Sequence, residues 1–350
     1  MRVMVAMSGG VDSSVAAARL VEDGHEVVGV TMKLWGGESD TGCCSVSDVD
    51  DARRVAQQLG IAHHVWTFTD DFEQRVVQPY VEAHRVGHTP NPCIECNRHL
   101  KFDRMLVRAL AVGFDAVATG HHARIAQLPD GRHRLARGAD TAKDQSYVLY
   151  VLGQEQLART LLPVGDLTKD QVRAEADRLG LRTATKPDSQ DVCFITSSAG
   201  RSGFLGRRLD FHPARVVDAA GADVGTVEAV ELVTVGQRRG LGLPGGSDSR
   251  YAVAVDVPNR TVQVGPPSQL DVTEVALHTM VWPTGVIAGE VLAQSSAHGT
   301  PRPARLAPHP DDPTQATVRF NDPTRRIAPA QSVVLYDDRD HEVLAGGLVV

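Results

Sequence analysis

A turn rich in glycine and serine follows a short apolar segment close to the N-terminus. It runs Ala6-Met7-Ser8-Gly9-Gly10-Val11-Asp12-Ser13-Ser14 and leads into an alanine-rich stretch. Two consecutive glycines let a backbone approach an anion closely, and the start of a helix offers amide groups and hydroxyls beside it. The Lys-Ser/Thr ending of a Walker loop is missing, so this is not the common phosphate-transferring loop. The turn predicts an anion site at a strand-to-helix junction; the alternative is a plain glycine turn with a serine cap.

Cysteine thiols in two distant segments are the second set of candidate functional groups. Cys93 and Cys96 form a Cys-x-x-Cys pair behind two prolines, and Cys193 lies much later, before Phe-Ile. Such a pair can be a redox pair, half of a metal site, or a nucleophile with a helper, whereas a lone cysteine is usually a small buried hydrophobe. With Cys43 and Cys44 the chain has five cysteines, an odd number that does not suit a secreted disulfide framework. We expect Cys43 and Cys44 to be incidental.

The first half of the chain alternates strand and helix patterns, which would place these groups. Short apolar strands are expected at residues 2–7, 27–34, 64–68 and 115–119, and helices at 13–22, 48–59, 100–112 and 168–179. Helices that alternate with short, nearly unbroken apolar strands indicate a parallel sheet covered on both faces.

The pattern changes after about residue 200, where short valine-rich runs alternate with glycine, proline and aspartate. The runs lie at residues 215–217, 251–257, 261–264, 316–320 and 332–336, and they predict small β domains. Residues 300–313 contain five prolines and are expected to form an exposed loop. We therefore expect three domains, at 1–202, 203–267 and 268–350.

Composition limits the classes of function. Hydrophobic residues make up 42% and charged residues 23% of the 350 positions, which is typical of globular proteins. No apolar run is long enough for a membrane helix and the apolar start is too short for a signal peptide, so we expect a cytoplasmic protein. The net charge of −7 excludes a wholly basic nucleic-acid coat, but residues 97–137 carry eight Lys/Arg against three Asp/Glu. That segment could hold a local nucleic-acid-binding face.

Several motifs together carry a resemblance to a known family. They are residues 8–13, 89–97, 119–121, 143–147, 188–195 and 235–242, followed by Ala330-Gln331. In this order they resemble the bacterial tRNA-specific 2-thiouridylases of the PP-loop ATPase superfamily, over nearly the whole chain. The resemblance implies an α/β fold with an N-terminal PP-loop domain, a small central domain and a C-terminal β-barrel.

The resemblance also implies a reaction. ATP with Mg²⁺ would adenylate the C2 oxygen of the wobble uracil, and sulfur would then replace the activated oxygen. Cys193 would receive a persulfide from a sulfur-donor protein, and Cys96 would discharge it, either leaving a disulfide after direct transfer or releasing hydrosulfide. Both routes stay open at the level of sequence. The tRNAs would be those for Lys, Glu and Gln.

Site residues follow from the same resemblance. The ATP-binding positions would be Ala6, Met7, Ser8, Gly9, Gly10, Val11, Asp12, Ser13, Met32 and Gly120. The target base would meet Asn91, Pro92 and Cys93, and tRNA would meet His121, Lys143, Asp144, Gln145 and Gln331.

The chain departs from the family pattern in places. Cys93 stands where many relatives have an acid, which raises the possibility of a [4Fe-4S] cluster on Cys93, Cys96 and Cys193; we favour simple redox spacing. His122 replaces a common tyrosine, and residues 296–298 lack a basic–aromatic contact. The rival functions are another PP-loop adenylating enzyme, which would need no distant cysteine pair, and an RNA-binding module without catalysis.

Overall fold

The structure is a computed structural model that describes residues 1–35, 46–188, 192–195, 199–244 and 249–350. Cys43 and Cys44, which we expected to be incidental, lie outside the described residues. Three sheet systems follow one another along the chain, and a small hairpin is inserted within the part of the chain that forms the first. No helix in these ranges is long and apolar enough to cross a membrane.

The first system is a five-stranded parallel sheet with strand order β3-β2-β1-β4-β7. Its strands are β1 (Arg2–Ala6), β2 (Glu26–Lys33), β3 (Ala62–Thr67), β4 (Ala116–Ala118) and β7 (Thr160–Leu161). Along β1, Val3 and Val5 pack into one core and Met4 packs into the other, since successive side chains point to opposite faces. The predicted sheet with two covered faces is therefore confirmed.

Two groups of helices cover these faces. Helices α1 (Val11–Glu22), α2 (Val46–Gln58) and α9 (Lys169–Arg178) share the core of Val3 and Val5. On the Met4 side lie two helical runs with π-helical middles: α3 (Thr69–Phe72), η1 (Glu73–Val77) and α4 (Gln78–Arg85), then α5 (Pro92–Cys96), η2 (Asn97–Arg104) and α6 (Met105–Ala111). The predicted helix at 100–112 thus extends back to Pro92, whose ring is suited to a first helical turn.

Shorter elements complete the first domain. The hairpin of β5 (Ala123–Gln127) and β6 (His133–Arg137) had no counterpart in the sequence predictions. It is followed by α7 (Ser146–Leu149) and α8 (Gln154–Ala158), and α10 (Gly200–Leu205) leads toward the next sheet.

The central sheet has strand order β10-β11-β8-β9 and a core of its own. Its strands are β8 (Ala214–Val217), β9 (Asp223–Val227), β10 (Tyr251–Asp256) and β11 (Thr261–Gly265), with short 3₁₀ turns η3 (Val230–Leu232) and η4 (Pro267–Leu270).

The last system is a closed barrel in the order β12-β15-β14-β13-β16-β17. Its strands are β12 (Asp271–Val281), β13 (Gly289–Gln294), β14 (Arg302–Pro308), β15 (Ala316–Arg325), β16 (Ser332–Tyr336) and β17 (Val343–Val349). The predicted loop at 300–313 is wrong, because it contains β14. Ala304 and Leu306 both point into the barrel core, with an exposed residue between them. This alternation is typical of a strand, and the segment forms one despite its prolines.

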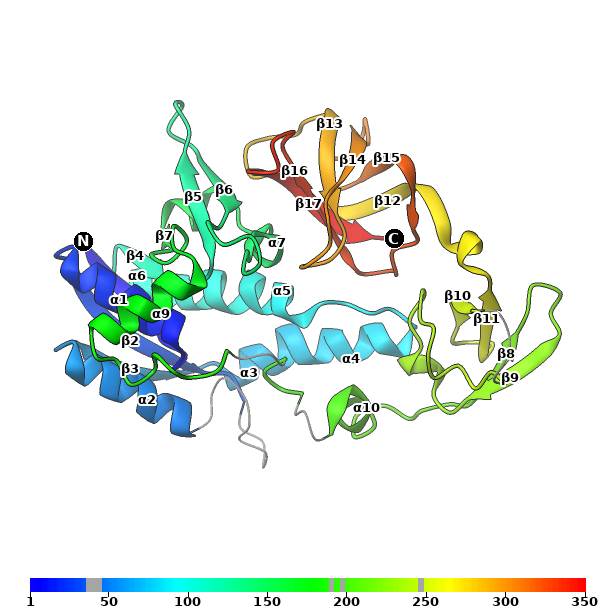
Figure 1. Cartoon of the computed structure of the whole chain (residues 1–350), viewed down its shortest axis with the longest axis horizontal. Helices are drawn as coiled ribbons and strands as arrows, with labels where there is room; N and C mark the ends of the chain where they lie inside the picture. Colours follow the sequence, from blue (N-terminus) through cyan, green and yellow to red (C-terminus); the bar gives the residue numbers. More distant parts are fainter. Residues whose placement is uncertain (36–45, 189–191, 196–198, 245–248) are drawn as a thin grey trace.

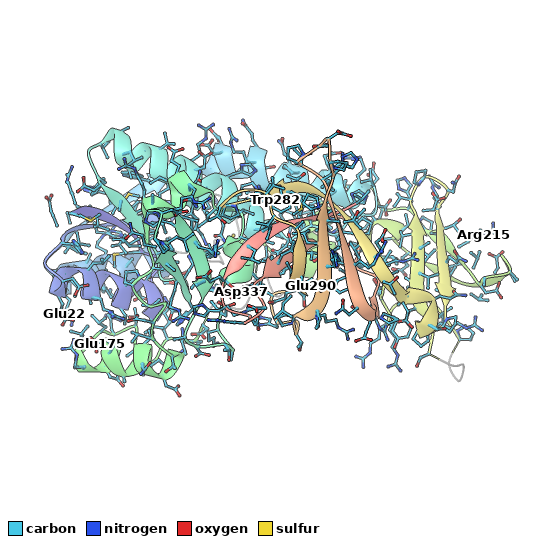
Figure 2. All side chains as sticks on the ribbon, turned by 90° about the horizontal axis from the view of Figure 1, so that it is seen from above. Glu22, Glu175, Arg215, Trp282, Glu290 and Asp337 are labelled. Carbon is cyan, nitrogen blue, oxygen red and sulfur yellow. The ribbon has the colours of Figure 1, made fainter. Side chains whose placement is uncertain are left out.

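The barrel packs on the first domain, and the central sheet lies at the far end (Figure 1). Seen from above, Glu22 and Glu175 lie at one end, Arg215 of the central sheet at the other, and Asp337 of the barrel between them (Figure 2). The hydroxyl of Tyr147 donates to the carbonyl of Ser332 at 2.8 Å, so buried polar contacts join the first domain to the barrel.

Candidate active site

The glycine-serine turn connects β1 to α1. Gly9 has φ = 73°, and a Cβ there would collide with the backbone oxygen of Asp48 in α2. The amide of Ser8 donates to Ser13 Oγ at 3.2 Å, and the hydroxyl of Ser14 donates to the carbonyl of Gly10 at 2.8 Å. These contacts hold the turn open at the N-terminus of a helix, which is a favourable environment for an anion.

Gly120 and Met32 lie at the same edge of the sheet as this turn. Gly120 follows β4, and a Cβ at that position would lie 2.6 Å from the amide of Ser13 and 2.7 Å from the carbonyl carbon of Asp12. Met32 is 8% exposed at the carboxyl end of β2. Because the carboxyl ends of parallel strands form the usual ligand crevice, the fold brings the predicted ATP residues together.

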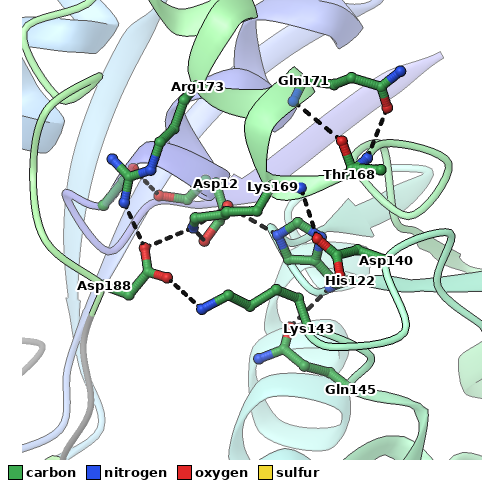
Figure 3. A network of polar contacts seen from close by, with 12 residues as sticks. Asp12, His122, Asp140, Lys143, Gln145, Thr168, Lys169, Gln171, Arg173 and Asp188 are labelled. Carbon is green, nitrogen blue, oxygen red and sulfur yellow. Dashed lines mark hydrogen bonds and ion pairs between the residues drawn. The ribbon is translucent and has the colours of Figure 1, made fainter.

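An ionic network begins at the turn (Figure 3). Lys169 Nζ lies 2.8 Å from both carboxylate oxygens of Asp12, and His122 Nε2 lies 3.0 Å from Oδ1. Burial alone would raise the pKa of Asp12, but the hydrogen bonds from His122 and Lys169 outweigh it and lower the pKa. Asp12 is therefore ionised and fixed beside the candidate phosphate site.

Asp188 extends the network toward Cys193. Its carboxylate pairs with Lys143 at 2.8 Å, with Lys169 at 2.8 Å and with Arg173 at 3.0 Å. Burial would raise the pKa of Asp188, but Lys143 and Lys169 lower it to about 2. Lys169 thus joins two carboxylates that are far apart in sequence.

Lys186 forms a second link between the Cys193 segment and the turn. Its ammonium group donates to the carbonyl of Gly9 at 3.0 Å, to Asp48 at 2.6 Å and to Asp51 at 2.8 Å. Sequence analysis did not identify Lys169, Arg173 or Lys186. The available signal was the start of the predicted helix at 168–179: Thr168 caps α9, which places Lys169 at its first position.

The three cysteines differ in exposure. Cys93 is exposed, Cys96 is 6% exposed within the large core cluster on the Met4 side of the sheet, and Cys193 is partly buried against that same cluster. Phe194, next to Cys193, packs 4.8 Å from the ring of Phe204 and 5.6 Å from that of Tyr80. Two motifs almost a hundred positions apart therefore meet one hydrophobic cluster.

A metal centre would need several ligating side chains close together in the described ranges. They contain no group of three His, Cys, Asp or Glu side chains close enough to hold a metal ion. Cys93, Cys96 and Cys193 therefore do not fit a [4Fe-4S] cluster in this structure.

The segment predicted to meet the target base is held from several sides. Asn91 Oδ1 accepts from the amide of Cys93 at 3.0 Å and caps α5, while Pro92 occupies its first turn. Gln331 donates to the carbonyl of Thr89, and the Thr89 hydroxyl lies 3.2 Å from that of Thr234. Both β domains thus contact the approach to the cysteine pair.

The remaining predicted tRNA contacts surround the ionic network. Lys143 pairs with Asp188, and Gln145 Oε1 accepts from the amide of His122 at 2.8 Å. Asp144 is 8% exposed and its carboxylate accepts internal hydrogen bonds. His121 is also buried; desolvation holds its pKa well below the ordinary value, so the ring is neutral. Their contact with RNA stays a prediction.

Comparison with known proteins defines the class first. The model described as tRNA methyl transferase HUP domain matches residues 1–197, that of the tRNA methyl transferase PRC-barrel domain matches 202–266, and that of the Aminomethyltransferase beta-barrel domain matches 272–349. The chain is thus a three-part protein in which an α/β HUP domain is followed by two β domains.

Full-length relatives then give the family. The tRNA-specific 2-thiouridylase of Mycobacteroides abscessus is 46% identical, with 100% of this chain and 99% of the relative covered. That of Mycolicibacterium smegmatis is 47% identical at the same coverage, and that of Roseiflexus castenholzii is 42% identical with 99% of both chains covered. The chain belongs to the tRNA-specific 2-thiouridylase family.

Proposed function

We propose that this protein is an ATP-dependent sulfurtransferase that replaces the C2 oxygen of the wobble uridine of tRNA by sulfur. The observation that carries the proposal is the combination, in one domain, of the anion-binding turn at residues 8–13 with Cys96 and Cys193 at one core cluster. An adenylating turn alone would suit many synthetases, and a thiol pair alone would suit a redox protein.

The turn, Met32 and Gly120 would hold ATP. A uracil oxygen is a poor leaving group, and transfer of AMP onto it makes departure possible. Mg²⁺ prefers carboxylate oxygens, so the ionised Asp12 is suited to the ion that accompanies ATP. Lys169 and Lys143 would balance the negative charge of the nucleotide.

The thiols would supply sulfur in a balanced sequence. A sulfur-donor protein would pass a persulfide to Cys193. In one route the Cys96 thiolate attacks the inner sulfur of Cys193, hydrosulfide leaves and adds to C2, AMP departs, and a Cys96–Cys193 disulfide forms. In the other route the terminal sulfur adds to C2 first and Cys96 then resolves the bond. Either way an external thiol must reduce the disulfide. Wobble-uridine tRNAs for Lys, Glu and Gln in the cytoplasm would be the substrates.

A reconstitution tests the proposal. The protein is incubated with a tRNA transcript, ATP, Mg²⁺ and a persulfide donor, and the nucleosides are analysed by mass spectrometry. Wild type should form 2-thiouridine at the wobble position with release of pyrophosphate and AMP, whereas Cys193→Ser should adenylate the tRNA and release pyrophosphate without thiolation. Cys96→Ser should accumulate persulfide on Cys193, while Cys44→Ser, at one of the two cysteines expected to be incidental, is the control.

Two results would change the assignment. Full thiolation by Cys193→Ser would contradict the persulfide relay. About four irons in the anaerobically purified protein, lost in Cys93→Ser, would replace it by the iron–sulfur alternative.

A further inference from the structure

Arg137, at the end of β6, extends its guanidinium group into the C-terminal barrel. Its Nε and Nη2 donate to Asp340 Oδ1 at 2.8 and 2.5 Å, and Nη2 also donates to Gln294 Oε1 at 2.8 Å. The guanidinium carbon lies 3.7 Å from the centre of the Tyr336 ring. The side chain is only 11% exposed, so three barrel residues enclose a planar cation.

The other edge of the same guanidinium group faces the first domain. Nη1 donates to Asp144 Oδ2 at 2.8 Å. Asp144 also accepts from the amides of Gly138 and Ser146, at 2.8 and 3.2 Å, and from the Ser146 hydroxyl at 2.7 Å. A buried carboxylate is stable only when it is paired and hydrogen-bonded, so Asp144 shapes the loop at residues 138–146 around itself and Arg137 supplies the balancing charge.

This loop leads directly into the candidate active site. Lys143 pairs with Asp188. The backbone amide of Gln145 donates to the carbonyl of His122 at 2.9 Å, and the side-chain Oε1 of Gln145 accepts from the backbone amide of His122 at 2.8 Å. His122 in turn contacts Asp12 (Figure 3). A continuous set of contacts therefore connects the barrel to the glycine-serine turn.

We propose that Arg137 is a positioning residue that lets the docked barrel fix residues 143–145 against the nucleotide site. The proposal concerns this chain's own residues and rests on the proposed function for its kinetic readout. Asp144, predicted from the family resemblance to touch RNA, would then act by shaping the loop through its pair with Arg137. A lysine at position 137 would keep the charge but not the planar fork that reaches Asp144, Asp340 and Gln294 together.

Arg134 provides a matched control on the same strand. Its Nη1 donates to Glu342 at 2.6 Å and its Nη2 to Thr284 Oγ1 at 3.3 Å, so it also contacts the barrel side. Its side chain is 22% exposed. Arg134→Gln removes a barrel contact without touching the pair of Arg137 and Asp144.

The test compares Arg137→Lys and Arg134→Gln in tRNA-dependent AMP release, with ATP, Mg²⁺ and the persulfide donor present. We expect Arg137→Lys to lower kcat/KM for tRNA by about tenfold to a hundredfold, because small misplacements of positioning groups have effects of that size. Affinity for ATP without tRNA should fall less than kcat/KM for tRNA, since Lys169 and His122 contact Asp12 directly and Arg137 does not. Arg134→Gln should match wild type in both measurements.

Asp340→Asn distinguishes the positioning role of Arg137 from a simple effect of local charge on RNA binding. Removing a negative charge should strengthen RNA binding if only the local potential matters, whereas the proposal predicts a lower kcat/KM for tRNA. Hydrogen exchange of the amides at residues 138–146 gives a readout that needs no activity: it should be faster in Arg137→Lys than in wild type or Arg134→Gln.

The outcomes are distinct for the two proposals. Equal exchange in all three proteins, or equal turnover by Arg137→Lys and Arg134→Gln, would overturn the positioning role. If wild type itself forms no AMP with tRNA, the proposed function fails, and the exchange comparison still decides whether Arg137 holds the loop.

Discussion

Several carboxylates and cations surround the candidate phosphate site. Lys169 bridges Asp12 and Asp188 although its side chain is only 10% exposed, and Lys143 and Arg173 add positive charge. A buried lysine is stable when carboxylates pair with it. Asp48 and Asp51 pair with Lys186 in the same way, so carboxylates match the cations at this site before a nucleotide binds.

Asp188→Asn should destabilise the protein in a pH-dependent way. Lys143 and Lys169 lower the pKa of this carboxylate from 3.8 to about 2 against the effect of burial, so its contribution is present above the unfolded-state value and is lost as pH falls through that interval. We expect a loss of about 1 kcal/mol at neutral pH, after allowance for solvent screening.

Urea unfolding at several pH values between neutral and strongly acidic measures this contribution. The difference between wild type and Asp188→Asn should shrink toward zero as pH approaches the folded-state pKa. Asp166→Asn, which breaks the more exposed pair with Arg19, is the control and should have a smaller effect. A difference that does not depend on pH would contradict the assignment to the carboxylate charge.

Gly120→Ala should weaken ATP binding. The added methyl group would lie 2.6–2.9 Å from atoms of Asp12 and Ser13, so the end of β4 must move away from the start of α1. We expect a loss of ~1–3 kcal/mol in the free energy of unfolding, which is typical of overpacking. Gly153→Ala is the control, because its methyl group would meet only the flexible end of Gln156 at 3.1 Å. Wild-type ATP affinity in calorimetry of Gly120→Ala would argue against close packing at this turn.

At the scale of elements, the structure divides the predicted basic segment in two. Arg98 and Arg104, on η2, pair with Glu95 at 3.4 Å and Asp71 at 3.1 Å. On the hairpin, Arg134 and Arg137 point into the barrel. The local excess of positive charge therefore serves partly to join the domains, and the helical run is the part that we expect to meet RNA.

The double variant Lys101→Gln, Arg104→Gln should flatten the salt dependence of tRNA binding. Each lost phosphate contact lowers the slope of log affinity against log salt by roughly 0.7–0.9. Filter binding at several salt concentrations measures this slope. Arg132→Gln, at the hairpin where Arg132 pairs with Asp130 at 2.6 Å, should leave it unchanged. An identical slope in both proteins would place the RNA on another face.

At the scale of the whole molecule, close packing joins the barrel to the first domain. Tyr147 and Tyr150 of α7 and the following turn bond to Ser332, and the backbone of Gly346 in β17 lies against the ring of Tyr150. These buried polar contacts need a single docked geometry, so we expect the two parts to unfold together.

Gly346→Ala should weaken the packing of the barrel on the first domain. The new methyl group would collide with the Tyr150 ring, 2.8 Å from Cε2, 2.9 Å from Cγ and closer still to Cδ2, so the barrel must shift. Scanning calorimetry should show a lower and broader transition than in wild type. Tyr150→Leu in the same chain should relieve the collision, so the double variant loses less stability than the sum of the single variants. Strict additivity would show that the two residues do not compete for space.

The sequence determined those features that depend on local pattern and chemical type. Residues 6–14 predicted a strand, a turn and a helix start, because glycine pairs and helix periodicity are local signals. The order of the motifs gave the family, and the valine-rich runs gave β domains. The proline-rich stretch misled, because its alternation of inward-facing Ala304 and Leu306 mattered more than its prolines.

Only the tertiary structure decided which charged side chains pair with one another. Nothing local in Lys169 or Lys186 shows which carboxylates they pair with, since Asp12 and Asp48 lie more than a hundred positions away. Asp144 is one of the residues predicted to contact tRNA, yet the fold buries it beside Arg137. A charged side chain on a loop forms a buried ion pair only when folding places an opposite charge next to it and removes both groups from water. That placement depends on the whole fold.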